Sequence, residues 1–291
     1  MVSVLQQIWP GAKETLAELM SQPITVGTLA LLLMGLLYHH CLLCYGSRRL
    51  HLVPLLLFGL LVLASLRQLP TDVSALALVS TVPVIAFVEL MVVAYARHYS
   101  PFLTFNSGLL VALLTLIHPG YLLLLPVQLQ KSERLGLNTA RHHSALLLGL
   151  LTTLIIALLL TIPPELSAVK ETLRKYFAPL GAIASPDGLS PLYLAGIGII
   201  FVGLSVQSYF TQQRSISRYR WMLLLHIMMM WLMILLFLFY GGQYGYLIGA
   251  LFFCSSSAHY LLVSSLHTLP LKLTLFGGVV LCLVGSIISL S

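Results

Sequence analysis

The stretch PFLTFNSGLLVALLTLIHPGYLLLLPVQLQ, from Pro101 to Gln130, decides the fold of this chain. As one continuous helix it would measure about 45 Å, against about 30 Å for the hydrocarbon layer of a membrane. Pro119 has no backbone N–H and its ring clashes with the preceding turn, so it would also interrupt such a helix. We therefore predict that residues 101–130 fold back, either as two short spans or as a re-entrant hairpin.

The composition of the whole chain is that of a membrane protein. Of its 291 residues, 59% are hydrophobic and only 8% are charged, whereas soluble domains carry about 25% charged residues. The net charge of +7 is what a multi-span protein acquires from basic cytoplasmic loops, so it does not indicate a nucleic-acid partner. The four cysteines lie in apolar segments and predict no disulfide framework. They are Cys41, Cys44, Cys254 and Cys282.

Apolar runs of spanning length predict an all-α polytopic membrane protein of about ten helices, in a single domain of residues 1–291. Two amphipathic segments, 1–22 and 163–180, are predicted to lie along the membrane surface as interfacial helices. The second belongs to a longer extracytoplasmic loop, 163–190. The predicted spans are 24–45, 50–66, 73–96, two within 101–130, 144–162, 192–210, 221–240, 244–266 and 273–290.

The distribution of basic residues predicts which side each loop faces. If residues 101–130 return to their starting side, ten of the 15 Lys and Arg residues share one side of the membrane. Loops rich in Lys and Arg stay in the cytoplasm, so both termini are predicted to be periplasmic. If residues 101–130 instead crossed the membrane once, the same 15 residues would divide nine to six. The charge rule alone barely distinguishes this arrangement from the fold-back.

Glu89 is a carboxylate predicted to lie inside a span. Carboxylates are costly in a membrane and commonly serve a function there. Glu89 also lies about two turns from the predicted cytoplasmic end of its helix, so a structural pair is the alternative. Its expected partners are His226, Asn106 or a loop arginine. The polar candidates for a functional site are Glu89, Asn106, Ser107 and His226.

A rim of basic residues is predicted at the cytoplasmic side of the spans. Arginine forks pair with phosphate oxygens, so such a rim suits a phosphate or an anionic lipid headgroup. The positive-inside bias alone would produce the same residues. The candidates are Arg97, Lys131, Arg134, Arg141, Arg214, Arg218 and Arg220.

Four potential metal ligands, His39, His40, Cys41 and Cys44, occur close together in the first span. Cys41 and Cys44 share a helix face, but neighbouring residues of a helix point about 100° apart. A tetrahedral site needs four converging ligands. We therefore expect no metal site and no bound cofactor.

Gly241, Gly245 and Gly249 recur at every fourth position into the ninth predicted span. Small residues at this spacing let two membrane helices approach closely. The three glycines are therefore predicted to form a helix-packing surface, which says nothing about a substrate.

Residues 105–161 resemble an uncharacterised family of polytopic inner-membrane proteins of Bacteroidota. The resemblance is carried by the Asn106-Ser107-Gly108 start, the apolar run to Pro119, a second apolar run, a basic loop and a long segment with Gly149. The resemblance implies a bacterial inner-membrane location and brings no known activity.

The scarcity of acidic side chains and the short loops favour a non-catalytic integral membrane subunit or assembly factor of a bacterial cell-envelope complex. The alternative is a transporter or membrane transferase that handles a lipid-linked or phosphate-bearing substrate at the cytoplasmic rim. This alternative rests on Glu89, the broken stretch and the basic residues. In both cases the expected partners are membrane lipids and other membrane proteins, with no nucleic acid.

Overall fold

A computed structural model describes residues 18–19, 21–45, 52–96, 100–117, 119–134, 139–161, 189–212, 217–239, 244–264 and 268–288. Over these residues the fold is all-helical, with ten α-helices, one short 3-10 helix and no strand. The predicted all-α class is confirmed. Six of the described helices are long and apolar enough to cross a membrane, as expected of a multi-pass membrane protein. The count of ten spans stays a prediction.

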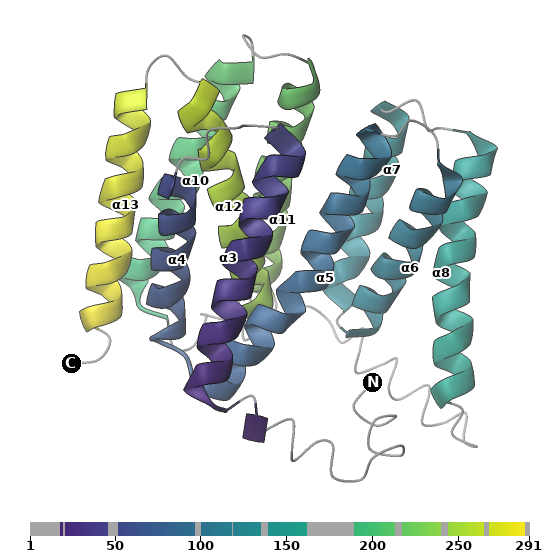
Figure 1. Ribbon diagram of the computed structural model, residues 1–291, viewed down its shortest axis with the longest axis horizontal. Helices are drawn as coiled ribbons and strands as arrows, with labels where there is room; N and C mark the ends of the chain where they lie inside the picture. The colour runs from purple at the N-terminus through teal and green to yellow at the C-terminus, as the bar shows by residue number, and fades with distance from the viewer. Residues whose placement is uncertain are drawn as a thin grey trace. The chain divides into compact units, whose positions relative to one another are not determined.

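The helices follow the predicted spans closely (Figure 1). Prolines occupy the first position of α3, α6 and α10, where the missing N–H would have had no partner within the helix. The predicted interfacial helices, 1–22 and 163–180, lie outside the described residues apart from positions 18–19 and 21–22. The elements are α3 (Pro23–Tyr45), α4 (Leu52–Leu66), α5 (Thr71–Ala96), α6 (Pro101–Ile117), η1 (Pro119–Leu123), α7 (Leu124–Arg134), α8 (Ala140–Thr161), α10 (Pro191–Gln212), α11 (Ser217–Phe239), α12 (Tyr244–Ser264) and α13 (Thr268–Ile288).

The described helices form two compact units, and α5 contributes to both. Unit 1 contains the part of α5 from Val82 onward together with α6, η1, α7 and α8. Unit 2 contains α3, α4, the part of α5 up to Thr81, and α10 to α13. The two parts of α5 meet next to Pro83, a residue inside the helix that removes one backbone hydrogen bond.

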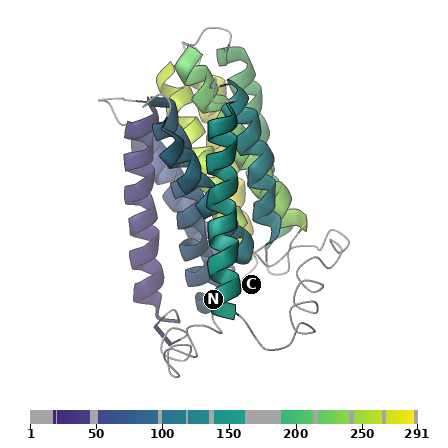
Figure 2. The ribbon, with the colours of Figure 1, turned by 90° about the vertical axis from the view of Figure 1, so that its right-hand side faces the viewer.

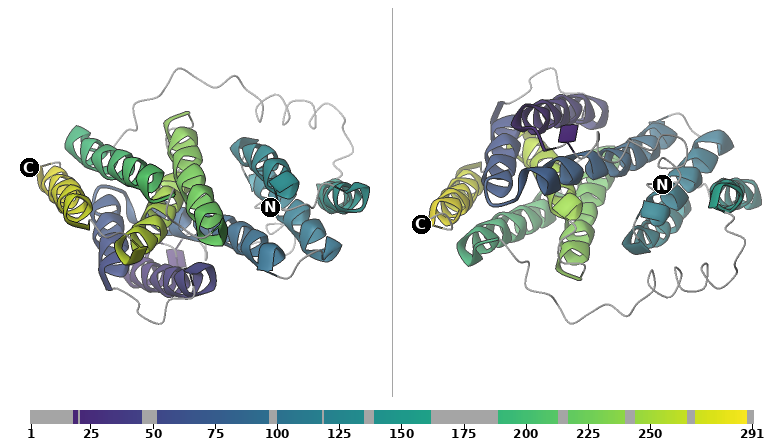
Figure 3. Two further views of the ribbon diagram at one scale, coloured as in Figure 1. Left: turned by 90° about the horizontal axis from the view of Figure 1, so that it is seen from above. Right: turned by 90° about the horizontal axis from the view of Figure 1, so that it is seen from below.

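α12 forms the centre of unit 2. Every residue from Tyr244 to Leu261 is buried, and α12 packs against α3, α4, α10, α11 and α13. Figure 3 shows it among these helices in the views along their axes. The sequence explains this position, because α12 carries no Asp, Glu, Lys or Arg and is mostly apolar on every face, as expected of a helix surrounded by others.

α10 and α13 approach each other closely through small residues. A Cβ atom added at Gly196 would lie 2.6 Å from the carbonyl oxygen of Gly278 and 2.7 Å from Sγ of Cys282. Further along, Gly203 faces Thr274, so the two helices run antiparallel. Membrane helices associate largely through such close packing, since lipid offers them no hydrophobic driving force.

Two glycines of α10 allow this contact to be tested. We expect Gly196→Ala to destabilise the protein by about 1–3 kcal/mol through overpacking, because the methyl group would meet backbone atoms of α13. Gly198→Ala is the matched control, since a Cβ atom there meets nothing within 4 Å. It should be neutral or stabilising by up to about 1 kcal/mol through helix propensity. Reversible unfolding in detergent measures both, and equal losses would contradict the close contact.

α6 and α8 of unit 1 lie side by side and run in the same direction (Figure 2, with α8 nearest the viewer). Thr104 contacts His142, Gly108 faces Leu146, and the hydroxyl of Thr153 donates to the carbonyl of Leu109. The residue numbers of these contacts increase together along α6 and α8, so the two helices are parallel. The chain must therefore return to its starting end between α6 and α8.

The return is made by η1 and α7. α6 ends at Ile117, and η1 begins at Pro119, so the break falls where the proline predicts it. By helix rise, the 17 residues of α6 measure about 25 Å, while the 5 residues of η1 and the 11 of α7 together measure about 26 Å. The two limbs of the stretch are thus similar in length, and each is slightly shorter than the hydrocarbon layer.

Candidate metal centre

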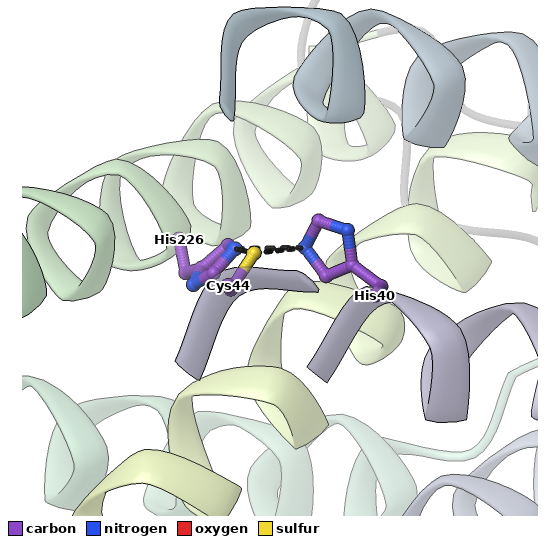
Figure 4. Close-up of side chains that lie close together, drawn as sticks. All are labelled: His40, Cys44 and His226. Carbon is purple, nitrogen blue, oxygen red and sulfur yellow. Dashed lines mark hydrogen bonds between the residues drawn. The ribbon is translucent and has the colours of Figure 1, made fainter. Parts of the chain in front are cut away.

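Three buried side chains with metal-binding atoms meet inside unit 2. His40 and Cys44 come from α3 and His226 comes from α11 (Figure 4). Nε2 of His40 lies 2.9 Å from Nε2 of His226. Sγ of Cys44 lies 3.5 Å from the first nitrogen and 3.9 Å from the second. All three residues have 0% exposure, so two imidazole nitrogens and one sulfur form a small triangle away from the surface.

Helix geometry accounts for the convergence. His40 and Cys44 are four positions apart, so they share one face of α3. α11 contacts this part of the unit, and its buried face brings His226 to the same point. Two rings of α12 cover the cluster: Phe252 lies 5.4 Å from His40 and Phe253 is stacked 6.0 Å from His226, between ring centroids. The triangle is therefore bordered by two apolar rings as well as by the ring of Tyr45.

Tyr45 orients His226 from the side opposite the triangle. Its hydroxyl lies 2.5 Å from Nδ1 of His226, and its ring is stacked on Tyr260 with centroids 5.0 Å apart. When Nδ1–H donates to the Tyr45 oxygen, Nε2 keeps a lone pair directed at His40 and Cys44. Metal-ligating histidines usually donate their second ring N–H in this way, which fixes the tautomer and the orientation of the ring.

The dimensions of the triangle fit a metal ion after a small adjustment. Metal–nitrogen bonds of about 2.05 Å and metal–sulfur bonds of about 2.3 Å imply S···N separations of about 3.5–3.8 Å for tetrahedral to trigonal angles. The observed values of 3.5 and 3.9 Å already match. The N···N distance of 2.9 Å would have to widen by about 0.5 Å. Among the described residues, no further His, Cys, Asp or Glu joins the group.

The other polar candidates from the sequence lie in unit 1. Glu89 is half-buried on α5, and Asn106 is half-buried on α6. Ser107 is buried, and its hydroxyl donates to the carbonyl of Thr104 at 2.8 Å. His226, considered above as a partner of Glu89, contacts His40, Cys44 and Tyr45. The structure thus places His226 in a cluster that the sequence did not predict.

Two residues of the predicted basic rim have described side chains, Arg141 and Arg220, and both are exposed. Next to Arg141, His142 is buried and its Nδ1 lies 3.2 Å from the Thr104 hydroxyl. His142 precedes the predicted span that begins at 144. Burial, and after it the charges of Arg141 and His143, lower the pKa of His142. The side chains outside the described residues are those of Arg97, Lys131, Arg134, Arg214 and Arg218.

The predicted glycine surface of α12 is described in part. A Cβ atom at Gly245 would collide with the Ser80 hydroxyl of α5, whereas one at Gly249 would make an ordinary contact with Met233 at 3.6 Å. The hydroxyl of Thr81 also donates to the Gly245 carbonyl at 3.3 Å. Gly241 lies outside the described residues. Of the two described glycines, Gly245 is therefore the one that is closely packed.

Part of the cluster could have been found in the sequence. His40 and Cys44 have the spacing that places two ligands on one helix face, as do Cys41 and Cys44. Cys41 is not one of the three converging ligands, and its Sγ lies 4.0 Å from the Ser256 hydroxyl. The expectation of no metal site rested on the residues of one helix and did not include the ligand that α11 supplies.

Comparison with known proteins gives no relative: no family model matches the chain, and no curated protein or solved structure is significantly similar to it. The resemblance of residues 105–161 to a Bacteroidota family stays a prediction. The fold and the cluster define the chain as a multi-pass helical protein with a buried His–Cys–His triangle, and its function has to be inferred from that chemistry.

Proposed function

We propose that this integral membrane protein holds a transition-metal ion between α3 and α11, with His40, Cys44 and His226 as ligands. The convergence of two imidazole nitrogens and a thiol within 4.8 Å of one another carries the proposal. Thiolate and imidazole are the ligands that zinc and copper prefer. The hydrogen bond in which Nδ1–H of His226 donates to the Tyr45 oxygen supports it further, because it supplies the outer contact that metal-binding histidines normally have.

The cluster lies near one end of α3 and α11. Cys44 is followed by the last residue of α3, Tyr45, and His226 lies six positions, about 9 Å, beyond the exposed Arg220. The distribution of basic residues favours the cytoplasmic side for this end, where thiols stay reduced. With this we propose ten spans, periplasmic termini and a location in the bacterial inner membrane.

We propose that the metal-holding protein serves as a non-catalytic subunit or assembly factor of a cell-envelope complex. Catalytic metal sites keep an open position for water or substrate. Here the ligands are fully buried and the rings of Phe252 and Phe253 lie against the two imidazoles. This surrounding supports retention of an ion over turnover of a substrate. Purification in mild detergent should recover partner proteins in stoichiometric amounts, and a protein recovered alone would count against the subunit role.

Metal analysis of the purified protein tests the metal site. Protein extracted from membranes without chelators should carry about one equivalent of transition metal per chain, and Cys44→Ser should lose most of it because serine removes the soft ligand. Cys254→Ser is the matched control, since Cys254 is an equally buried thiol on α12 outside the cluster. A wild-type protein that carries no metal, and takes up neither zinc nor copper on reconstitution, would overturn the proposal.

A further inference from the structure

We infer that the ion held by His40, Cys44 and His226 is copper in its monovalent state, Cu(I). This inference rests on the metal site proposed above and specifies its occupant. A Cys44 thiolate carries one negative charge and two neutral imidazoles carry none. Cu(I) therefore gives a cluster with no net charge, whereas Zn(II) or any other divalent ion leaves one positive charge on it.

The net charge matters because the cluster is fully buried. An ion pair or charge inside an apolar interior is tolerated only when it is compensated. Within the described part of unit 2, the carboxylates are those of Glu18 and Asp72, and both residues are exposed. No carboxylate of the described residues joins the cluster. A divalent ion would therefore have no carboxylate among these ligands to balance its extra charge.

The number and kind of ligands point to the same ion. Zinc held by protein ligands is almost always four-coordinate, and the described residues supply three. The rings of Phe252 and Phe253 pack near the two imidazoles, and all three ligands have 0% exposure. Thiolate suits both Cu(I) and zinc, whereas thioether sulfur suits Cu(I) and is not among the usual ligands of zinc. On α11, buried methionines occupy the positions one turn before and after His226, on the same face of the helix: Met222, Met229 and Met230.

On binding, Cu(I) replaces the proton on the sulfur of Cys44. The S–H bond of Cys44 breaks, an S–Cu bond forms, and one proton leaves for each ion bound. In the metal-free protein the Nε2–H of His40 donates to Nε2 of His226, so on binding this proton moves to Nδ1 of His40. Both imidazoles then donate lone pairs from Nε2 and stay neutral. Copper enters and remains as Cu(I), so the step needs neither an oxidant nor a reductant.

Competition titrations under anaerobic conditions test the inference. Full-length protein in detergent is titrated with Cu(I) against bicinchoninate, and separately with Zn(II) against a colorimetric chelator. We expect one Cu(I) per chain, bound at least about 100-fold more tightly by the wild type than by Cys44→Ser. Cys254→Ser should match the wild type. Zn(II) binding should be weak and the same in all three proteins. Copper X-ray absorption of the wild type should show one sulfur and two nitrogen neighbours.

Each alternative outcome has a distinct meaning. One tightly held Zn(II) that depends on Cys44, with weak Cu(I) binding, would overturn the copper inference and leave the metal site intact. Binding of neither ion would overturn both. Cu(I) bound equally by wild type and Cys44→Ser would overturn this site. If Cys44→Ser does not fold, the absorption spectrum of the wild type decides alone, and the absence of a sulfur neighbour overturns the inference.

Discussion

Gly149→Val is expected to separate α6 from α8 and to destabilise unit 1 by about 3 kcal/mol or more. A Cβ atom at Gly149 would collide with the carbonyl oxygen of Phe105 and lie 2.9 Å from the backbone nitrogen of Leu109. The contact is reciprocal, since a Cβ atom at Gly108 would lie 2.5 Å from the carbonyl oxygen of Leu146. Backbone atoms cannot rotate away as a side chain can. The helices would have to move apart.

The same separation would weaken the polar contacts that accompany the glycines, because Thr153 donates to the Leu109 carbonyl across the two helices. Leu147→Val serves as the control, since it places the same β-branched residue in α8 at an exposed position. Its effect should stay within about 0.5 kcal/mol. Unfolding in mixed micelles, followed by circular dichroism, compares the two. Similar midpoints for both variants would show that α6 and α8 are not held by the glycine contact.

The positions of the helices could be predicted because membrane thickness and proline set them. Pro119 predicts the break that separates α6 from α7, and prolines open three other helices. Three starts were placed four or five residues too late, among them that of α11, which begins at Ser217 ahead of the predicted 221. α13 begins at Thr268, ahead of the predicted 273, because Pro270 is tolerated in a first turn. α8 begins at Ala140, ahead of 144, because a helix can continue through polar residues outside the membrane.

The site could be predicted only in part, because its ligands come from helices far apart in the sequence. The spacing of His40 and Cys44 is visible within α3, and it marks a shared face. The approach of α11, which brings His226, depends on how unit 2 packs. No local sequence pattern predicts that α11 packs against α3. The glycine contacts have the same limit: the sequence shows where Gly149 and Gly196 are, and the structure shows which helix each one faces.

His226→Leu is expected to abolish metal binding and, in the metal-free protein, to lower the free energy of unfolding by about 2–4 kcal/mol. The ring contacts His40, Cys44 and Tyr45 at once. Leucine fills a similar volume but leaves the buried Tyr45 hydroxyl and the His40 ring without this partner, and each lost partner of a buried polar group costs about 1–3 kcal/mol. His39→Leu is the control, because His39 is an exposed neighbour on α3.

A double-mutant cycle separates the hydrogen bond from the loss of packing in that result. Tyr45→Phe removes the hydroxyl that His226 contacts at 2.5 Å. In that variant, His226→Leu no longer breaks a hydrogen bond to residue 45. The double variant Tyr45→Phe/His226→Leu should therefore be more stable than the sum of the single losses predicts, by about 1–2 kcal/mol. Equilibrium unfolding of the metal-free proteins measures this coupling without reference to any ion. Additive losses would mean that Tyr45 does not hold His226, and the ring would then lack the contact that directs its Nε2 toward Cys44.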